Sequence, residues 1–393
     1  MYDKALIALI PSGYRDGGLY SVLPANGDGD FNFTRSSTAT RVNKDGLIET
    51  IPLHTPRLDY PLTNSVVGDC PHLLLEPIRT NLFPYSNFHG TGGLGTFTSG
   101  TSSITVTNDY ATSPDGTQNA MRMVATCGST SSDRAVLRDL LTMTATDGTL
   151  SFYGKSNTGS NQRIAFHFIG GNKTVVTLTN EWQRFTYTET SNTGNYAGVE
   201  IRGTFTDTDV DVLLFGFQME QASYATSYIP TENDPSGVTR SADFCNLSGI
   251  GAEFNTSEGV LFVESAALAD DLTFRQVTLN DSSSNTILVG YRTNSNRIYA
   301  QVVSNNVSQA FISYDVADIT EFHKIALKYS TNSVHLWIDG VKRASDTSAT
   351  MPTSLSELDL QGTTGSAQFY AKTKQVIYFN EALSDSELQT LTS

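Results

Sequence analysis

Residues 213–244 read LLFGFQMEQASYATSYIPTENDPSGVTRSADF, and this stretch decides how the chain is divided. Its beginning continues a near-unbroken apolar run, VDVLLFGFQME, which is typical of a buried strand. Pro230 and Pro235 follow within a few positions, and a proline has no backbone N–H to offer a neighbouring strand. We therefore expect a closing strand, then a linker over 230–237, and a second series of strands from Val238.

The length and composition favour an all-β protein with more than one domain. The chain has 393 residues, more than one ordinary domain, and only 17% of them are charged. Short apolar runs alternate with turns rich in Gly, Ser, Thr and Asn, as in antiparallel β-sandwiches. We predict three units: a small β-rich module over 1–88, a jelly roll over 89–232 and a second sandwich over 238–393.

The second sandwich is expected to end in the one convincing helix of the chain. Ser384 and Glu387 have the spacing of a capping box, in which each side chain bonds the other residue's backbone N–H. Leu388 and Leu391 form an apolar stripe beyond it. The sequence therefore predicts a short C-terminal helix packed on the sandwich.

Charge, hydropathy and cysteine usage indicate which partners and which folding compartment are expected. A formal net charge of −15 would repel a phosphate backbone, and no Lys/Arg cluster offsets it, so nucleic acid is not expected to bind. The apolar run ALIALI is too short for a signal peptide, and no stretch has the length of a membrane span, so membrane insertion is not expected. Three cysteines without a CxxC pair indicate folding in a reducing cytoplasm.

Several motifs resemble those of bacteriophage proteins. GLYSVLP, DGDFNFTRSSTATRVN, PRLDY and CPHLLLEPIRTNLFPYSNF follow one another as in phage structural proteins. The sequence ATSYIPT followed by VTRSAD resembles a junction in tail-fibre and other virion-surface proteins. There a carbohydrate-binding-module-like jelly roll passes into a concanavalin A-like or laminin G-like domain, which FHKIALKYSTNSVHLWIDGVKRAS also resembles.

The resemblance implies a virion structural protein, assembled in the host bacterial cytoplasm and displayed on the virion surface as a tail fibre or other appendage. Residues 1–88 would dock to other virion proteins, and the two sandwiches would attach to host-surface or environmental glycan. A homo-oligomer is expected, as in trimeric fibres, although no coiled-coil heptad is present to enforce one. The alternative is a purely structural decoration protein whose domains make only protein contacts.

Aromatic side chains are the candidate sugar contacts of the jelly roll, because sugar rings stack their C–H faces on aromatic rings. The segment EWQRFTYT resembles a strand of carbohydrate-binding modules in which the tryptophan is commonly a core residue, so Trp182 is expected in the core. The predicted contacts of this unit are Tyr153, Phe168, Tyr187 and Tyr196.

The sharpest ligand hypothesis concerns the hairpin TILVGYRTNSNRIYAQ in the second sandwich. It combines aromatic rings with planar hydrogen-bonding groups, which sugar recognition requires. The alternative is a polar turn between two ordinary strands. The candidate ligand-binding residues are Tyr291, Arg292, Asn294, Asn296, Arg297 and Tyr299.

Three carboxylates alternate near the end of the jelly roll. Asp207, Asp209 and Asp211 would lie on one face of a strand, where like charges repel unless they are solvated or neutralised. The pattern indicates either an exposed edge or a structural calcium ion. No other cofactor is expected.

No catalytic motif is evident, so the sequence predicts that the chain is not an enzyme. The segment from Glu357 to Gly362, ELDLQG, approaches the carboxylate strand of concanavalin A-like glycanases but lacks the final carboxylate. Without a paired acid, two-carboxylate glycoside hydrolysis cannot proceed there. A polysaccharide depolymerase with carboxylates on separate strands is the third function considered.

Overall fold

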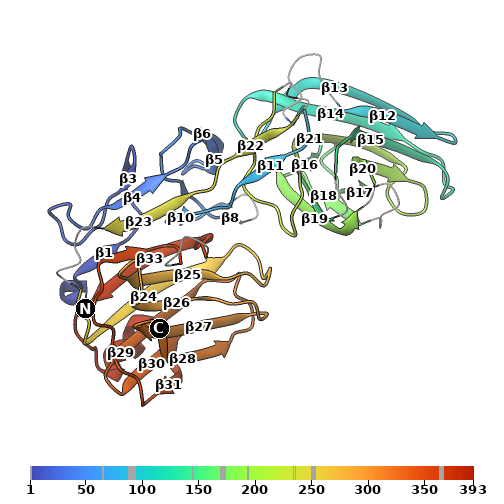
Figure 1. Cartoon of the computed structure of the whole chain (residues 1–393). Coiled ribbons are helices and arrows are strands. Elements are labelled where there is room, and N and C mark those ends of the chain that lie inside the picture. Colours follow the sequence, from blue (N-terminus) through green and yellow to red (C-terminus); the bar gives the residue numbers. More distant parts are fainter. Residues whose placement is uncertain are drawn as a thin grey trace.

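The structure is a computed structural model, and it describes residues 2–63, 66–86, 94–143, 146–168, 174–192, 194–232, 234, 236–248, 254–362 and 367–393. It has two lobes joined by a narrower region (Figure 1). We call them the jelly-roll lobe, which holds the middle of the chain, and the terminal lobe, which holds both chain ends. The pairings between neighbouring strands are antiparallel in both lobes, which confirms the all-β fold class with tandem sandwiches.

The jelly-roll lobe is a sandwich of two five-stranded sheets. One sheet has the order β12 (Gly95–Ser99), β15 (Arg134–Leu140), β20 (Tyr196–Arg202), β17 (Gln162–Phe168) and β18 (Val175–Leu178). The other has the order β13 (Ser103–Thr112), β14 (Gln118–Thr126), β21 (Asp209–Glu220), β16 (Thr146–Ser156) and β19 (Gln183–Asn192). Alternate residues of each strand point between the sheets and form one apolar core that includes Phe152, Phe166 and Phe217.

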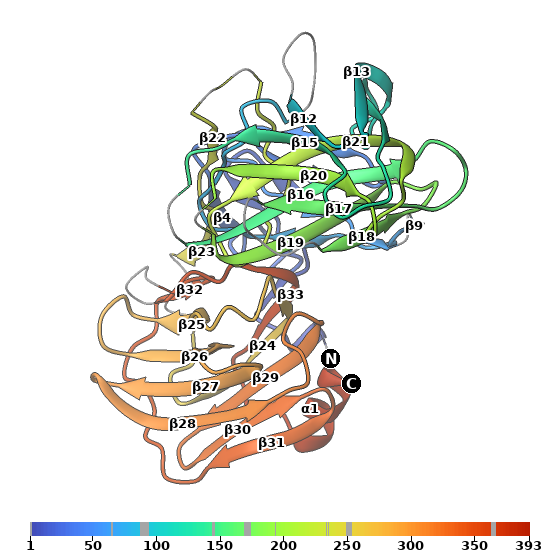
Figure 2. The same cartoon turned by 90° about the vertical axis from the view of Figure 1, so that its right-hand side faces the viewer.

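The terminal lobe packs an eight-stranded sheet on a nine-stranded sheet (Figure 2). The first has the order β31 (Val341–Asp346), β30 (Ser333–Ile338), β29 (His323–Ser330), β24 (Glu258–Ala267), β33 (Ala371–Phe379), β10 (His72–Leu74) and β7 (Leu58–Asp59), with β1 (Ile7–Leu9) also paired to β33. The second has the order β2 (Tyr14–Arg15), β3 (Gly18–Leu19), β4 (Phe31–Thr34), β23 (Phe244–Ser248), β32 (Glu357–Asp359), β25 (Arg275–Asn280), β26 (Thr286–Tyr291), β27 (Arg297–Ser304) and β28 (Val307–Asp315).

Six short strands of the N-terminal segment, β1, β2, β3, β4, β7 and β10, belong to the two sheets of the terminal lobe. Ile7 of β1 lies opposite Tyr378 of β33, and Phe33 of β4 lies opposite Cys245 of β23. Both Ile7 and Phe33 are fully buried in the core cluster that holds the residues of β24 to β33. The sandwich is therefore not closed by residues 238–393 alone. The predicted boundary at residue 88 lies outside the described residues.

The helix α1 (Asp385–Thr392) ends the chain on the terminal lobe. The Ser384 Oγ accepts a bond from the Glu387 N–H, and the Glu387 side chain accepts one from the Ser384 N–H, so the predicted capping box is confirmed. Leu388 is buried against a small apolar cluster of the eight-stranded sheet. Within the part of the chain that the structure describes, no helix has the length and apolar character of a membrane span.

The lobes meet at five buried charged side chains, which we call the junction cluster: Arg35, Arg57, Glu76, Arg240 and Asp243. The Glu76 Oε2 lies 2.6 Å from the Arg57 Nη1 and 2.6 Å from the Arg240 Nη1. Asp243 forms ion pairs with Arg35 and Arg57. Burial alone would raise the pKa of Glu76, but Arg240, Arg57 and bonds from Ser227 outweigh it and hold that pKa far below its usual range. The motifs DGDFNFTRSSTATRVN, PRLDY, CPHLLLEPIRTNLFPYSNF and VTRSAD supply the residues of this cluster.

The segment after β21, which precedes the predicted linker, folds back on that strand. The Thr226 N–H donates to Glu220 Oε2 at 2.9 Å, and the Ile229 N–H donates to Gln218 Oε1 at 2.6 Å. Thr226, Ile229 and Thr231 are buried as a result. Within the predicted linker 230–237, Asn233 and Pro235 lie outside the described residues, and the segment enters β22 (Val238–Arg240), which pairs with β11 (Arg79–Asn81).

Candidate functional site

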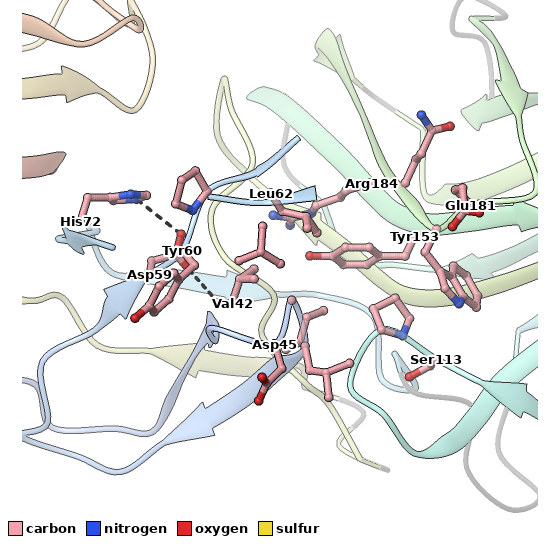
Figure 3. A pocket seen from close by; sticks show the side chains of 18 of the residues that line it. Val42, Asp45, Asp59, Tyr60, Leu62, His72, Ser113, Tyr153, Glu181 and Arg184 are labelled. Atoms are coloured by element: carbon pink, nitrogen blue, oxygen red, sulfur yellow. Dashed lines mark hydrogen bonds and ion pairs between the residues drawn. The ribbon is translucent and has the colours of Figure 1, made fainter. Parts of the chain in front are cut away.

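A groove of about 720 Å³ lies where the two lobes face each other (Figure 3). Its volume is within the range of ligand pockets. Three parts of the chain supply its walls: the segment 42–72, the jelly-roll face around Tyr153, and the terminal-lobe residues Phe322 and Lys372. A smaller cavity of about 230 Å³ shares lining residues with it, including Tyr153 and Arg184, and reaches toward Ser227. We call the larger space the junction groove.

The jelly-roll wall follows from the pairing of β16 with β19. Phe152 lies opposite Phe185 and faces the core, so the next pair, Tyr153 and Arg184, faces outward into the groove. The Arg184 Cζ lies 5.5 Å from the centroid of the Tyr153 ring, and its Nη2 donates to the Thr226 carbonyl at 2.7 Å. Figure 3 shows Tyr153 reaching across the groove toward Leu62. This wall therefore presents a fixed aromatic ring beside a guanidinium.

Trp182 precedes β19 and lines the same wall. The resemblance of EWQRFTYT to a strand with a core tryptophan predicted burial of Trp182, but in the structure it is only partly buried beside Tyr153. The Lys155 Nζ lies 5.5 Å from the centroid of the indole ring. An indole with part of its face in a groove is a surface on which an apolar ring face can stack.

The opposite wall is the hairpin of β5 (Ala39–Val42) and β6 (Ile48–Ile51). The Asn43 Oδ1 accepts bonds from the Asp45 and Leu47 N–H groups, and Gly46 has φ +78°, which together set the tight turn that Asp45-Gly46 predicts. The Ile48 N–H donates to the Pro114 carbonyl of the jelly-roll lobe at 2.9 Å. The hairpin is thus tied to both lobes and gives the groove a defined width.

Asp59 and His72 lie at the terminal-lobe end of the groove, 3.4 Å apart between the Asp59 Oδ2 and the His72 Nε2. The Asp59 Oδ1 also accepts a bond from the Val42 N–H at 2.7 Å. Burial raises the pKa of Asp59 to about 6 and lowers the pKa of His72 to about 3, the latter with help from Lys372. At neutral pH this end of the groove therefore holds a neutral imidazole beside a carboxyl group that titrates close to pH 6.

Of the four aromatic residues predicted to contact sugar, Tyr153 alone lines the groove. Phe168 is fully buried between the jelly-roll sheets, and Tyr187 packs against the same core. Tyr196 lies in the other sheet, where the Arg138 Cζ sits 4.1 Å from its ring centroid. The four side chains do not share a face, since neighbouring strand positions point to opposite sides of a sheet.

The predicted hairpin of the second sandwich uses most of its polar groups internally. Tyr291 is fully buried, with its OH 3.0 Å from the Ser265 Oγ and its ring stacked on Phe369. Arg297 forms a two-bond ion pair with Asp315. The proposal that Tyr291 offers an aromatic face to sugar is therefore wrong, because no part of its ring reaches solvent.

The remaining residues of the hairpin have separate roles. The Asn296 Oδ1 accepts a bond from the Ile319 N–H at 3.1 Å, and Asn294 is exposed, with its carbonyl accepting a bond from the Arg297 N–H. Arg292 and Tyr299 lie together on the outer face of the sheet. The structure thus brings only this last pair together as a surface.

The three alternating carboxylates of the jelly-roll lobe do not converge. Asp207 precedes β21 and pairs with Arg163 at 3.1 Å, whereas Asp211 pairs with Arg122 at 2.6 Å. Asp209 is exposed at the start of the strand. Among the described residues there is no group of three or more His, Cys, Asp or Glu side chains that could hold a metal ion. The repulsion that suggested calcium is relieved here by arginine.

Comparisons with known proteins give only distant likenesses. No protein-family model matches the chain, and no curated protein sequence matches it. The tandem carbohydrate-binding domains of Paenibacillus barcinonensis Xyn10C align at 11% identity and a TM-score of 0.28, over 78% of this chain and 99% of theirs. Mouse laminin α1 domains LG4-5 align at 10% identity and a TM-score of 0.28, over 63% and 88%.

Trypanosoma rangeli sialidase in complex with sialic acid aligns at 10% identity and a TM-score of 0.28, over 92% of this chain and 76% of the sialidase. At such values these likenesses carry no argument about function. They include enzymes such as this sialidase, so the sequence-based prediction that the chain is not an enzyme is contradicted, and its enzymatic status is not decided by them. Catalysis is therefore considered below beside binding.

Proposed function

We propose that the protein binds carbohydrate in the junction groove. The observation that carries this proposal is the wall formed by Trp182, Tyr153 and Arg184, which combines aromatic rings with a guanidinium held in place by a backbone carbonyl. Sugars present an apolar C–H face to aromatic rings and hydroxyl groups to planar donors and acceptors. Gln183 and Asp59 add an amide and a carboxyl group to the same groove.

The groove fits an extended ligand better than a single compact one. The smaller cavity continues it past Tyr153 and Arg184 toward Ser227, so a ligand lying along both would contact both lobes. An oligosaccharide has this shape, and it can exchange its hydration for several polar contacts spread along the groove. We therefore propose a stretch of polysaccharide as the ligand class.

A glycan array followed by titration of the best ligand tests the proposal. Trp182→Ala should weaken binding about tenfold or more, since stacking on an exposed ring contributes on the order of 1–2 kcal/mol. Phe205→Ala is the matched control, because Phe205 is an exposed aromatic residue of the same lobe that does not line the groove. Equal affinity of the two variants, or no glycan binding by the unmodified protein, would favour the alternative of a structural protein that makes only protein contacts.

A second candidate function is hydrolysis of a glycan in the same groove. Asp59 favours it, because a carboxyl group with a pKa near 6 is protonated often enough near neutral pH to act as a general acid. Asp45 and Glu181 also line the groove and are the candidates for the second carboxylate that glycoside hydrolysis needs. Release of reducing ends by the unmodified protein, abolished in Asp59→Asn while binding persists, would establish this activity. Absence of reducing ends with a bound glycan would refute it.

The wider role that we propose is that of a bacteriophage virion-surface protein that attaches to host or environmental glycan. Its support is the series of sequence motifs that resemble phage structural proteins. Docking to other virion proteins through residues 1–88 and assembly as a homo-oligomer belong to the same proposal. A map of the purified virion tests it: density for both lobes on the particle surface is expected, and a particle without this chain would refute it.

A further inference from the structure

A second candidate site lies on the terminal lobe, on the outer face of the nine-stranded sheet. The inner face of β25 to β28 is apolar and belongs to the core, with Val289 and Ile298 among its residues. The alternate positions point outward, and Gly290 lies opposite Tyr299 on the neighbouring strand. Gly290 contributes no side chain to the outer face beside the Tyr299 ring.

Three aromatic rings surround one guanidinium there. The Arg292 Cζ lies 4.6 Å from the ring centroid of Phe311, 5.4 Å from that of Phe274 and 5.5 Å from that of Tyr299. The Tyr299 ring is buried beneath the other groups, and the Gln276 Nε2 donates to its OH. Phe274 and Phe311, by contrast, are 42% and 43% exposed. We call these four residues, Arg292, Phe274, Tyr299 and Phe311, the arginine platform.

The charge of Arg292 has no carboxylate partner among the residues that the structure describes. The acidic groups around this end of the hairpin are committed elsewhere: Asp271 pairs with Arg275, and Asp315 pairs with Arg297. The Asp270 Oδ2 accepts bonds from Ser295 and Asn296, while its Oδ1 is buried without a hydrogen-bond partner within the described part of the chain. The Arg292 Nε is moreover buried without a hydrogen-bond partner in the described structure. An arginine with unused donors inside an exposed aromatic frame is a site for a planar anion.

We infer that the arginine platform binds a sugar residue that carries a carboxylate. The guanidinium can bind the carboxylate with two parallel bonds, while Phe274 or Phe311 stacks on the C–H face of the pyranose ring. A neutral sugar would leave the charge unused, and an apolar protein surface would bury it without a counter-charge, which is costly. The acidic sugar is therefore the occupant that satisfies both parts of the platform.

This inference extends the proposed glycan binding to a second surface, and it is tested independently because the platform shares no residue with the junction groove. The probes are trigalacturonate and sialyllactose, with galactotriose and lactose as their neutral counterparts. Titration followed by NMR or calorimetry should show that at least one acidic probe binds about tenfold or more tightly than its neutral counterpart, as expected for a charge-assisted pair. Its affinity should fall as salt rises.

Variants assign the binding to the platform. Arg292→Gln should weaken binding of the acidic probe about tenfold, and Phe311→Ala should weaken both acidic and neutral sugars. The control is Arg297→Gln, because Arg297 belongs to the same hairpin but pairs with Asp315, and the guanidinium stacked on the three rings is that of Arg292. Melting curves of all variants verify that the fold is intact. The inference is overturned if neither acidic probe is preferred, or if Arg292→Gln and Arg297→Gln bind equally well. Trp182→Ala should leave this binding unchanged.

Discussion

The two lobes are both β-sandwiches, yet they are assembled from the chain in different ways. Both five-stranded sheets of the jelly-roll lobe come from one continuous segment, from β12 to β21. The terminal lobe needs the two ends of the chain, since β1, β7 and β10 lie in the same sheet as β33. The comparison teaches that a sandwich can look complete in sequence while part of its core is supplied by residues some 370 positions away, as between Ile7 and Tyr378.

The largest difference between the lobes is expected when each is expressed as a separate fragment. Residues 238–393 expressed alone should fail to fold, because they lack the buried side chains of the N-terminal segment, such as Ile7, Phe31, Phe33 and Leu73. Each such loss costs about 2–5 kcal/mol, and together they exceed the roughly 5–15 kcal/mol by which a domain is stable. Circular dichroism and thermal melting would show whether the fragment 238–393 is folded.

The matched fragment, residues 79–232, should fold. It retains Phe83, which is buried in the jelly-roll core, and Asn81, whose Nδ2 donates to the Phe217 and Ile229 carbonyls. A cooperative melt for 238–393, or none for 79–232, would show that the lobes do not differ in this way.

The next largest effect is expected at the junction cluster. Glu76→Gln should destabilise the protein by about 3–5 kcal/mol, because it leaves Arg57 and Arg240 buried with too little negative charge. Glu49→Gln breaks a pair with Arg41 near the surface and should cost less than about 1 kcal/mol. Urea denaturation measures the free energy of unfolding of both variants. Equal decreases would show that burial does not determine how much the cluster contributes to stability.

The hairpin of β26 and β27 allows a buried and an exposed side chain of the terminal lobe to be compared. Tyr291→Ala should cost about 3–5 kcal/mol, since it empties a fully buried space beside Phe369. Arg297→Gln should cost less than about 1 kcal/mol, because its ion pair with Asp315 is exposed. Denaturation curves measure both, and a stable Tyr291→Ala variant would return this residue to the list of surface candidates.

The smallest effect concerns pH and the groove between the lobes. The pKa of Asp59 is raised from 3.8 to about 6, so the folded protein holds this proton more tightly than the unfolded chain does. Its contribution to stability is therefore fully present below about pH 4 and is lost as the pH rises through about 6. Asp59→Asn has no such proton to lose.

Relative to the unmodified protein, the stability of Asp59→Asn should therefore rise by up to about 3 kcal/mol between pH 4 and pH 7, at about 1.36 kcal/mol per pKa unit. His72, whose pKa burial lowers to about 3, titrates in both proteins. Urea denaturation at several pH values measures the difference. A difference that does not vary with pH would show that Asp59 is solvated in the folded protein.

Local patterns predicted the fold class well. Alternation identified the strands, and Ser384 with Glu387 identified the helix start, because these signals depend on neighbouring residues alone. Pairing between distant segments was not predictable in this way. Nothing near Ile7 in the sequence indicates that β33 is its partner.

The candidate sites show the same division. Tyr153, Arg292 and Tyr299 were predicted from the sequence as ligand contacts. Arg184, Phe274 and Phe311 were not, because the pairing of strands that are apart in the sequence brings Arg184 beside Tyr153 and the two phenylalanines beside Tyr299. Tyr291 was predicted to lie on a surface, but it is two positions after Val289 on β26, and both side chains lie on the inner face of the sheet. Which of two alternating faces is buried depends on the sheet packed against the strand, and a single strand does not reveal it.

The pairing of β1 with β33 also sets an order of events during synthesis. The ribosome releases β1 long before its partner β33 (Ala371–Phe379), because the two strands are far apart in the sequence. At about 5–20 residues per second, the N-terminal strands wait for tens of seconds while the jelly-roll lobe is completed between them. During that interval β1, within ALIALI, has no sheet strand to pair with, so it is a segment of the nascent chain that a chaperone would have to shield.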